Sequence, residues 1–152
     1  MKALVIGYGS IGSRHARILS EVGVRTTVVS SRDVDFFPRA KTVAQALGKD
    51  RFDYVVIANK TSEHLGTLRQ LDQNGYRGVV LVEKPLYLKP SSEKFRFKKI
   101  LVAYNLRFHP ALLELRRRLN KEKVVSAFCY VGKYLPDWHP DKDYRRRYSS
   151  IK

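Results

Sequence analysis

The sequence holds only one cysteine, Cys129, and one residue each of tryptophan and methionine. A single cysteine excludes an internal disulfide and any zinc site built on paired cysteines. No apolar run reaches the roughly 20 residues that cross a bilayer, and Met1 leads directly into a strand-like segment without the apolar core of a signal peptide. We therefore expect a cytoplasmic protein in a reducing compartment, with no membrane partner and no metal site.

Acidic residues are also scarce, since 14 Asp and Glu accompany 30 Lys and Arg and leave a net charge of +16. The excess is largest in residues 91–152, which hold 16 basic and 6 acidic residues. Such a segment can form solvated surface, or it can contact phosphates or nucleic acid. Because no helix-turn-helix, zinc-finger or RNA-binding signature accompanies the charge, we favour solvated surface over a nucleic-acid partner.

Short apolar runs alternate with segments of helical periodicity along most of the 152 residues, a length typical of about one domain. The predicted strands cover residues 2–6, 26–30, 54–58, 79–82, 100–104 and 124–130. The predicted helices cover residues 11–22, 42–47, 111–119, and a segment from a cap at Thr61 or Ser62 to Asn74 and Gly75.

Strands that alternate with helices at this spacing imply right-handed crossovers and a doubly wound parallel sheet, the α/β Rossmann architecture. We assign residues 1–105 to this domain. Residues 106–152 are predicted to hold a helix, opened by Pro110, and one further strand.

Three glycines, Gly7, Gly9 and Gly12, follow the first predicted strand and open the first predicted helix. In this context the first glycine allows a tight turn, the second lets a pyrophosphate approach the backbone, and the third lets the helix pack against the strand. The helix N-terminus, at Ser10 and Ile11, offers free N–H groups to the phosphates. The alternative is an ordinary glycine-rich turn.

The end of the second strand bears on the choice between the two nicotinamide cofactors. Ser30, Ser31 and Arg32 stand there, and hydroxyls with a guanidinium can receive the 2′-phosphate of NADP. Asp33 comes one residue later and can bind the ribose of NAD if the strand ends later. We predict NADP as the cofactor, with NAD as the second choice.

A further motif, Glu83-Lys84-Pro85, ends the fourth predicted strand. Together with the glycine signature, the I-A-N-K-T-S-E-H segment at 57–64 and the V-A-Y-N-L-R-F-H-P segment at 102–110, it resembles the Gfo/Idh/MocA family of oxidoreductases. The tail at 134–148 is similar to members from bacterial surface-sugar biosynthesis. The resemblance implies an NAD(P)-dependent oxidoreductase acting on a sugar or sugar-nucleotide substrate.

The resemblance also implies roles for single residues. Lys84 is the expected catalytic residue, because an ammonium beside the reacting carbon can polarise a carbonyl or assist proton movement at a hydroxyl. Arg107 is a candidate for a substrate oxyanion or for an ion pair between domains, and His64 is a candidate cofactor neighbour or a first-turn helix residue. The remaining expected cofactor neighbours are Asn59, Thr61, Glu83, Lys84 and Asn105.

Complete members of that family continue into a glycine-rich strand and an Asp-x-x-x-His motif, which this sequence lacks. The resemblance therefore implies a chain that retains mainly the cofactor half, with low turnover. Residues 1–105 would be the dinucleotide-binding domain, and residues 106–152 would be a linker helix and the first strand of an incomplete α+β substrate domain. An open edge at the strand predicted over 124–130 favours a homo-oligomer. The alternative hypothesis is a non-catalytic dinucleotide-binding or regulatory module.

Overall fold

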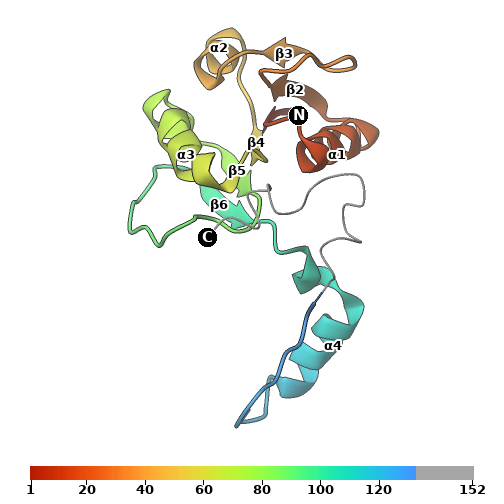
Figure 1. Ribbon diagram of the computed structural model, residues 1–152. Helices are drawn as coiled ribbons and strands as arrows, with labels where there is room; N and C mark the ends of the chain where they lie inside the picture. Colours follow the sequence, from red (N-terminus) through yellow and green to blue (C-terminus); the bar gives the residue numbers. More distant parts are fainter. Residues whose placement is uncertain (133–152) are drawn as a thin grey trace. The chain divides into compact units, whose positions relative to one another are not determined.

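The computed structural model describes residues 1–132, with a first compact unit, Met1–Arg107, and a second unit that begins at Phe108. Within these residues the first unit forms one six-stranded parallel sheet in the order β3-β2-β1-β4-β5-β6 (Figure 1). The predicted Rossmann-type α/β fold is confirmed. The strands are β1 (Lys2–Ile6), β2 (Arg25–Val29), β3 (Arg39–Ala40), β4 (Tyr54–Ile57), β5 (Val79–Val82) and β6 (Lys99–Val102).

Helices cover both faces of the sheet, which explains why its strands are apolar on both sides. Alternate residues of β1 belong to different cores, since Leu4 packs with α3 (His64–Gln73) and Val5 packs with α1 (Ser10–Glu21). The helix α2 (Val43–Lys49) lies on the α3 side, where its Ala46 joins Leu71 of α3 in the larger core.

The helix ends follow local signals in the sequence. α1 and α3 stop before Gly23 and Gly75, each with a positive φ, as their positions predict. The predicted cap at Thr61 or Ser62 is wrong. The short 3-10 turn η1 (Thr61–Glu63) comes first, and its Glu63 N–H bonds to the Lys60 carbonyl, so that α3 begins only at His64.

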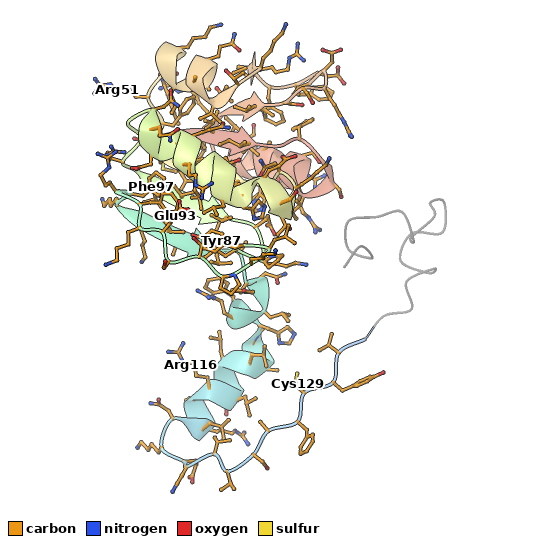
Figure 2. All side chains as sticks on the ribbon, turned by 60° about the vertical axis from the view of Figure 1, so that its left-hand side comes forward. Arg51, Tyr87, Glu93, Phe97, Arg116 and Cys129 are labelled. Carbon is orange, nitrogen blue, oxygen red and sulfur yellow. The ribbon has the colours of Figure 1, made fainter. Side chains whose placement is uncertain are left out.

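The connection from β5 to β6 contains no helix between residues 83 and 98, although it crosses the face that carries α3. Aromatic rings fill this place instead, and Phe97 stacks on Phe95 with ring centroids 5.5 Å apart. Ion pairs from Glu93 to Arg69 and from Arg96 to Asp72 attach the connection to α3. Figure 2 shows Phe97 and Glu93 beside that helix.

The second unit contributes the helix α4 (Pro110–Leu119), which Pro110 opens as predicted. Glu114 accepts hydrogen bonds from Arg117 and Arg118, which lower its carboxyl pKa to about 2. The strand predicted over 124–130 is wrong. A strand needs a partner for its backbone groups, and residues 124–130 pair with no other segment that the structure describes. The strand that was predicted to form an open edge is therefore absent from the described residues.

No helix within residues 1–132 is both long enough and apolar enough to cross a membrane. The same residues contain no group of three His, Cys, Asp or Glu side chains that could hold a metal ion. Cys129 is a free and exposed cysteine.

Candidate functional site

The order in which strands are added to the sheet reverses at β1. β2 and β3 lie on one side of β1, and β4, β5 and β6 lie on the other. The chain leaves β1 through α1 toward β2, and it returns from β3 through α2 to β4 on the opposite face. Ligands of doubly wound sheets bind outside the carboxyl ends of the strands at such a switch point. Gly7 and Asn59, which follow β1 and β4, meet at this edge.

Gly7 and Gly12 are glycines because a side chain at either position would clash with the protein backbone. Gly7 has a φ of +94°, and a Cβ there would lie 2.6 Å from the backbone nitrogen of Asn59. A Cβ on Gly12 would collide with the carbonyl oxygen of Gly7. Both glycines therefore allow α1 to start directly against the ends of β1 and β4.

Gly9 differs from the other two, because a Cβ at this position would meet no protein atom within 4 Å. Its backbone, with a φ of −86° and a ψ of −167°, is one that other residues adopt. No side chain caps α1, so the first N–H groups of the helix, at Ser10 and Ile11, face this open space without an intrahelical partner. The arrangement fits an anionic group seated against the backbone.

Asn59 brings an unused acceptor to the same edge. Its Nδ2 donates to Thr67 Oγ1 at 2.9 Å, whereas its Oδ1 is buried and has no partner among the described residues. Buried polar atoms are normally hydrogen-bonded. Asn59 therefore lies beside the glycine turn with one acceptor that no described residue uses, and a ligand can reach this buried oxygen only if the side chain turns.

Hydrogen bonds between the Ser30 side chain and the Arg32 backbone fix the turn after β2. The Ser30 hydroxyl donates to the Arg32 carbonyl at 3.0 Å and accepts from the Arg32 N–H at 2.9 Å. Asp33 pairs with Arg39 at 3.0 Å. The side chains of Ser31 and Arg32 are exposed, so a guanidinium and a hydroxyl are accessible while the nearby carboxylate already faces a cation.

Glu83 lies in the turn after β5 and contacts a residue that the sequence reasoning missed. His15 Nε2, on α1, lies 2.7 Å from Glu83 Oε1, and both side chains are largely buried. Burial raises the pKa of the Glu83 carboxyl. The hydrogen bond and charge of His15, together with the backbone N–H and ammonium of Lys84, outweigh this effect, and the pKa ends below its ordinary value.

Glu83→Gln is expected to lower the melting temperature near neutral pH and to have little effect in strong acid. Because the folded-state pKa lies below the ordinary 4.5, the carboxylate stabilises the fold above that pH, and this stability is lost as the pH falls through the lowered value. Thermal unfolding of both proteins across the acid range measures it. Asp35→Asn, which removes an exposed carboxylate, is the control, and an equal effect of both variants would contradict the prediction.

Two of the predicted cofactor neighbours after β4 are buried. Thr61 is 7% exposed and His64 is 1% exposed. The His64 ring lies between backbone carbonyls, with Nδ1 at 3.1 Å from Pro85 O and Nε2 at 3.3 Å from Asn59 O. Its nitrogens therefore face the protein.

Lys84 is exposed at the carboxyl end of β5, and its ammonium has no hydrogen bond or ion pair within residues 1–132. Asn105 and Arg107 follow β6 in a short 3-10 turn, η2 (Asn105–Phe108). The Arg107 guanidinium lies 6.0 Å from the centroid of the Tyr104 ring. In the described chain no hydrogen bond joins these two residues to Lys84.

A groove of about 560 Å³ runs from the glycine turn along α1. Its walls combine Tyr8 and Phe37, whose rings meet edge to face at 6.3 Å, with the basic side chains Arg14 and Arg17. Neither this groove nor the contact of His15 can be predicted from the sequence, because only the fold brings α1 to the loop before β3 and to the end of β5.

No family model and no curated protein matches the sequence. Several solved structures do match. The WlbA (WbpB) dehydrogenase from Thermus thermophilus in complex with NAD and alpha-ketoglutarate is 22% identical with a TM-score of 0.64, over 82% of this chain and 48% of that chain. The UDP-N-acetylglucosamine 3-dehydrogenase GnnA from Acidithiobacillus ferrooxidans is 20% identical with a TM-score of 0.59, over 78% and 43%.

The WlbA dehydrogenase from Bordetella pertussis in complex with NADH and UDP-GlcNAcA is 15% identical with a TM-score of 0.67, over 79% of this chain and 42% of that chain. At these identities the likeness shows a common fold. This chain spans less than half the length of each of the three proteins.

Proposed function

We propose that the first unit binds a nicotinamide dinucleotide and supplies the cofactor-binding part of an oxidoreductase that acts on a sugar or sugar nucleotide. The observation that carries the proposal is the open space at Gly9 above the free amides of α1, at the switch point of the sheet. The resemblance to the Gfo/Idh/MocA family supports it, as do the NAD, NADH and UDP-sugar bound to proteins of the same fold.

We assign each part of the cofactor to different residues at the carboxyl edge of the sheet. The amides of Ser10 and Ile11 hold the pyrophosphate, with Gly9 leaving room for it. Asn59, which follows β4 beside the glycine turn, is assigned to a ribose. Lys84 follows β5, the strand next to β4, and we assign it to the nicotinamide end.

A bound nicotinamide would supply hydride exchange with a carbon of the substrate. The oxygen on that carbon must lose a proton in one direction and gain it in the other. In the direction of reduction the Lys84 ammonium gives this oxygen its proton, and in the direction of oxidation the amine left on Lys84 takes the proton back. Arg107, which follows β6 at the same edge, is the proposed partner of a substrate oxyanion.

We propose NADP as the preferred cofactor, with NAD as the second choice. Arg32 and Ser31 are exposed after β2, and Asp33 is already paired with Arg39, so the local charge favours a 2′-phosphate. The proteins of similar fold were crystallised with NAD or NADH, and direct titration decides between the two cofactors.

Titration of the chain with NADPH, NADH and ADP-ribose tests the proposal. We expect all three to raise the melting temperature, because all carry the pyrophosphate, and NADPH to bind about tenfold more tightly than NADH, a difference of about 1.4 kcal/mol. Cofactor fluorescence measures the two dissociation constants. If none of the three ligands changes the melting temperature, the proposed function is wrong.

Arg32→Ala isolates the contribution of the 2′-phosphate and is expected to bring the two affinities together. Arg25→Ala is the matched control, since Arg25 is also exposed but lies at the opposite end of β2. If Arg32→Ala leaves the preference unchanged, this residue does not select the cofactor.

A second candidate function is a dinucleotide-binding module without catalysis. The chain spans less than half the length of the dehydrogenases that share its fold. A panel of sugars and sugar nucleotides separates the two functions. Reduction of the nicotinamide with any of them indicates an oxidoreductase, and a cofactor-stabilised protein that reduces none indicates a module.

A further inference from the structure

The turn that carries Lys84 is held by two histidines from opposite layers of the fold. His15 comes from α1 on one face of the sheet, and His64 comes from α3 on the other. His15 contacts the residue before Lys84, and His64 contacts the backbone after it.

The contact of His15 joins the phosphate end of the site to this turn. His15 Nε2 lies 2.7 Å from Glu83 Oε1, between residues 68 positions apart in the chain. His15 stands on the same helix whose first amides face the open space at Gly9. A single helix, α1, therefore fixes the distance between Glu83 and a group bound at those amides.

The contacts of His64 join the turn to the end of β4. Nδ1 lies 3.1 Å from Pro85 O and 3.3 Å from Leu86 O, while Nε2 lies 3.3 Å from Asn59 O. Because the ring is 1% exposed, no water can replace these partners without opening the core. The backbone after Lys84 is thereby held against the loop that carries Asn59.

Lys84 itself makes no comparable contact. Its backbone N–H lies 3.3 Å from Glu83 Oε2, and its ammonium has no partner within the described residues. The position of this side chain is therefore set by the neighbours on either side of it, and these are the groups that the two histidines hold.

We propose that His15 and His64 are positioning residues that place the Lys84 ammonium against the nicotinamide end of the bound cofactor. This inference rests on the proposed function. If the proposal holds, replacing a histidine affects the position of the Lys84 ammonium but not the binding of the cofactor. The pyrophosphate remains on the amides of α1 when a histidine is replaced, while Lys84 moves away from the nicotinamide, and a misplacement of about 1 Å can cost a hundredfold in rate.

Trace acetylation of lysines by acetic anhydride, followed by mass spectrometry, measures this placement without requiring turnover. The readout is the labelling rate of Lys84 relative to Lys49 on α2, without ligand and with saturating NADH or ADP-ribose. We expect NADH to protect Lys84 about tenfold and ADP-ribose to leave it reactive, because only NADH carries the nicotinamide, and tenfold corresponds to about 1.4 kcal/mol.

Matched variants keep or remove each contact. His15→Gln keeps an N–H that can reach Glu83, and His15→Leu does not. At His64, the Asn variant keeps a donor toward Pro85, whereas the Gln variant places its amide toward Asn59 instead. We expect protection by NADH to survive in His15→Gln and His64→Asn and to fall below about twofold in His15→Leu and His64→Gln at saturating NADH.

The outcomes separate this inference from the proposed function. If the wild-type protein neither binds NADH nor is protected by it, both are wrong. If the His15→Leu protein binds NADH and protects Lys84 as the wild type does, the proposed function stands and the positioning role is wrong. His15 is partly accessible, with 22% of its side chain exposed, so His15→Leu carries the test alone if a His64 variant does not fold.

Discussion

Alanine in place of Gly9 is expected to weaken the binding of NADPH and NADH at least tenfold, by about 1.4 kcal/mol or more, and to reduce the stability of the fold by no more than about 1 kcal/mol, because Gly9 is the N-cap of α1. The backbone at this position suits any residue, and the added Cβ would meet no protein atom within 4 Å. The same Cβ would occupy the space above the amides of α1 where the pyrophosphate is proposed to lie. Dissociation constants and melting temperatures of both proteins, measured in parallel, check the prediction.

Two other glycines serve as controls for Gly9→Ala. Gly48 lies on α2, where a Cβ is equally unobstructed, and Gly48→Ala should leave binding intact and stabilise the fold by up to about 1 kcal/mol, because alanine favours a helix more than glycine does. Gly12→Ala should reduce both, because its Cβ would collide with the carbonyl oxygen of Gly7. If Gly9→Ala bound the cofactors as tightly as the wild type, the pyrophosphate would have to lie elsewhere.

Leu71→Ala is expected to destabilise the first unit by about 2–5 kcal/mol, the usual range for a fully buried leucine. Leu71 has no exposed surface and joins α3 to the core that contains Leu4 of the central strand β1. Since small domains are stable by only about 5–15 kcal/mol, the loss should lower the melting temperature by at least about 10 °C. Thermal and urea unfolding of the variant measure both quantities.

Leu88→Ala removes the same atoms at a position that is 67% exposed, and it should change the stability by less than about 0.5 kcal/mol. A loss at Leu71 no larger than that at Leu88 would mean that α3 is not packed on the sheet as described. NADPH titration of the Leu71→Ala protein below its melting temperature should still detect binding, because Leu71 lies on α3 in one core of the sheet, whereas the glycine turn opens α1, which packs in the other core.

The predicted strands that became part of the sheet share one property, a run of apolar residues bounded by glycine or polar residues. β5 was predicted with its observed ends, and β1 likewise. β3 is only two residues long, Arg39–Ala40, and carries no apolar run, so no sequence pattern could reveal it. Its pairing with Val28 and Val29 of β2 depends on the neighbouring strand.

The segment 124–130 is the opposite case, a strand that was predicted from the sequence but does not form. Its apolar, β-branched composition predicts a strand, yet the structure contains none there, and Phe128 is fully exposed. Composition reports a preference for strand, while a strand also requires a second segment to accept and donate its backbone hydrogen bonds.

The sequence by itself determined what depends on near neighbours: every strand of the sheet except β3, the four helices of the described residues, the helix ends before Gly23 and Gly75, and the glycine turn between β1 and α1. Only the tertiary structure decided which distant groups meet. His15 reaches Glu83 across 68 positions, and His64 reaches Pro85 across 21. The physical reason is that a turn or a helix end forms from residues adjacent in the chain, whereas these contacts exist only once the order of the strands brings both layers to one edge of the sheet.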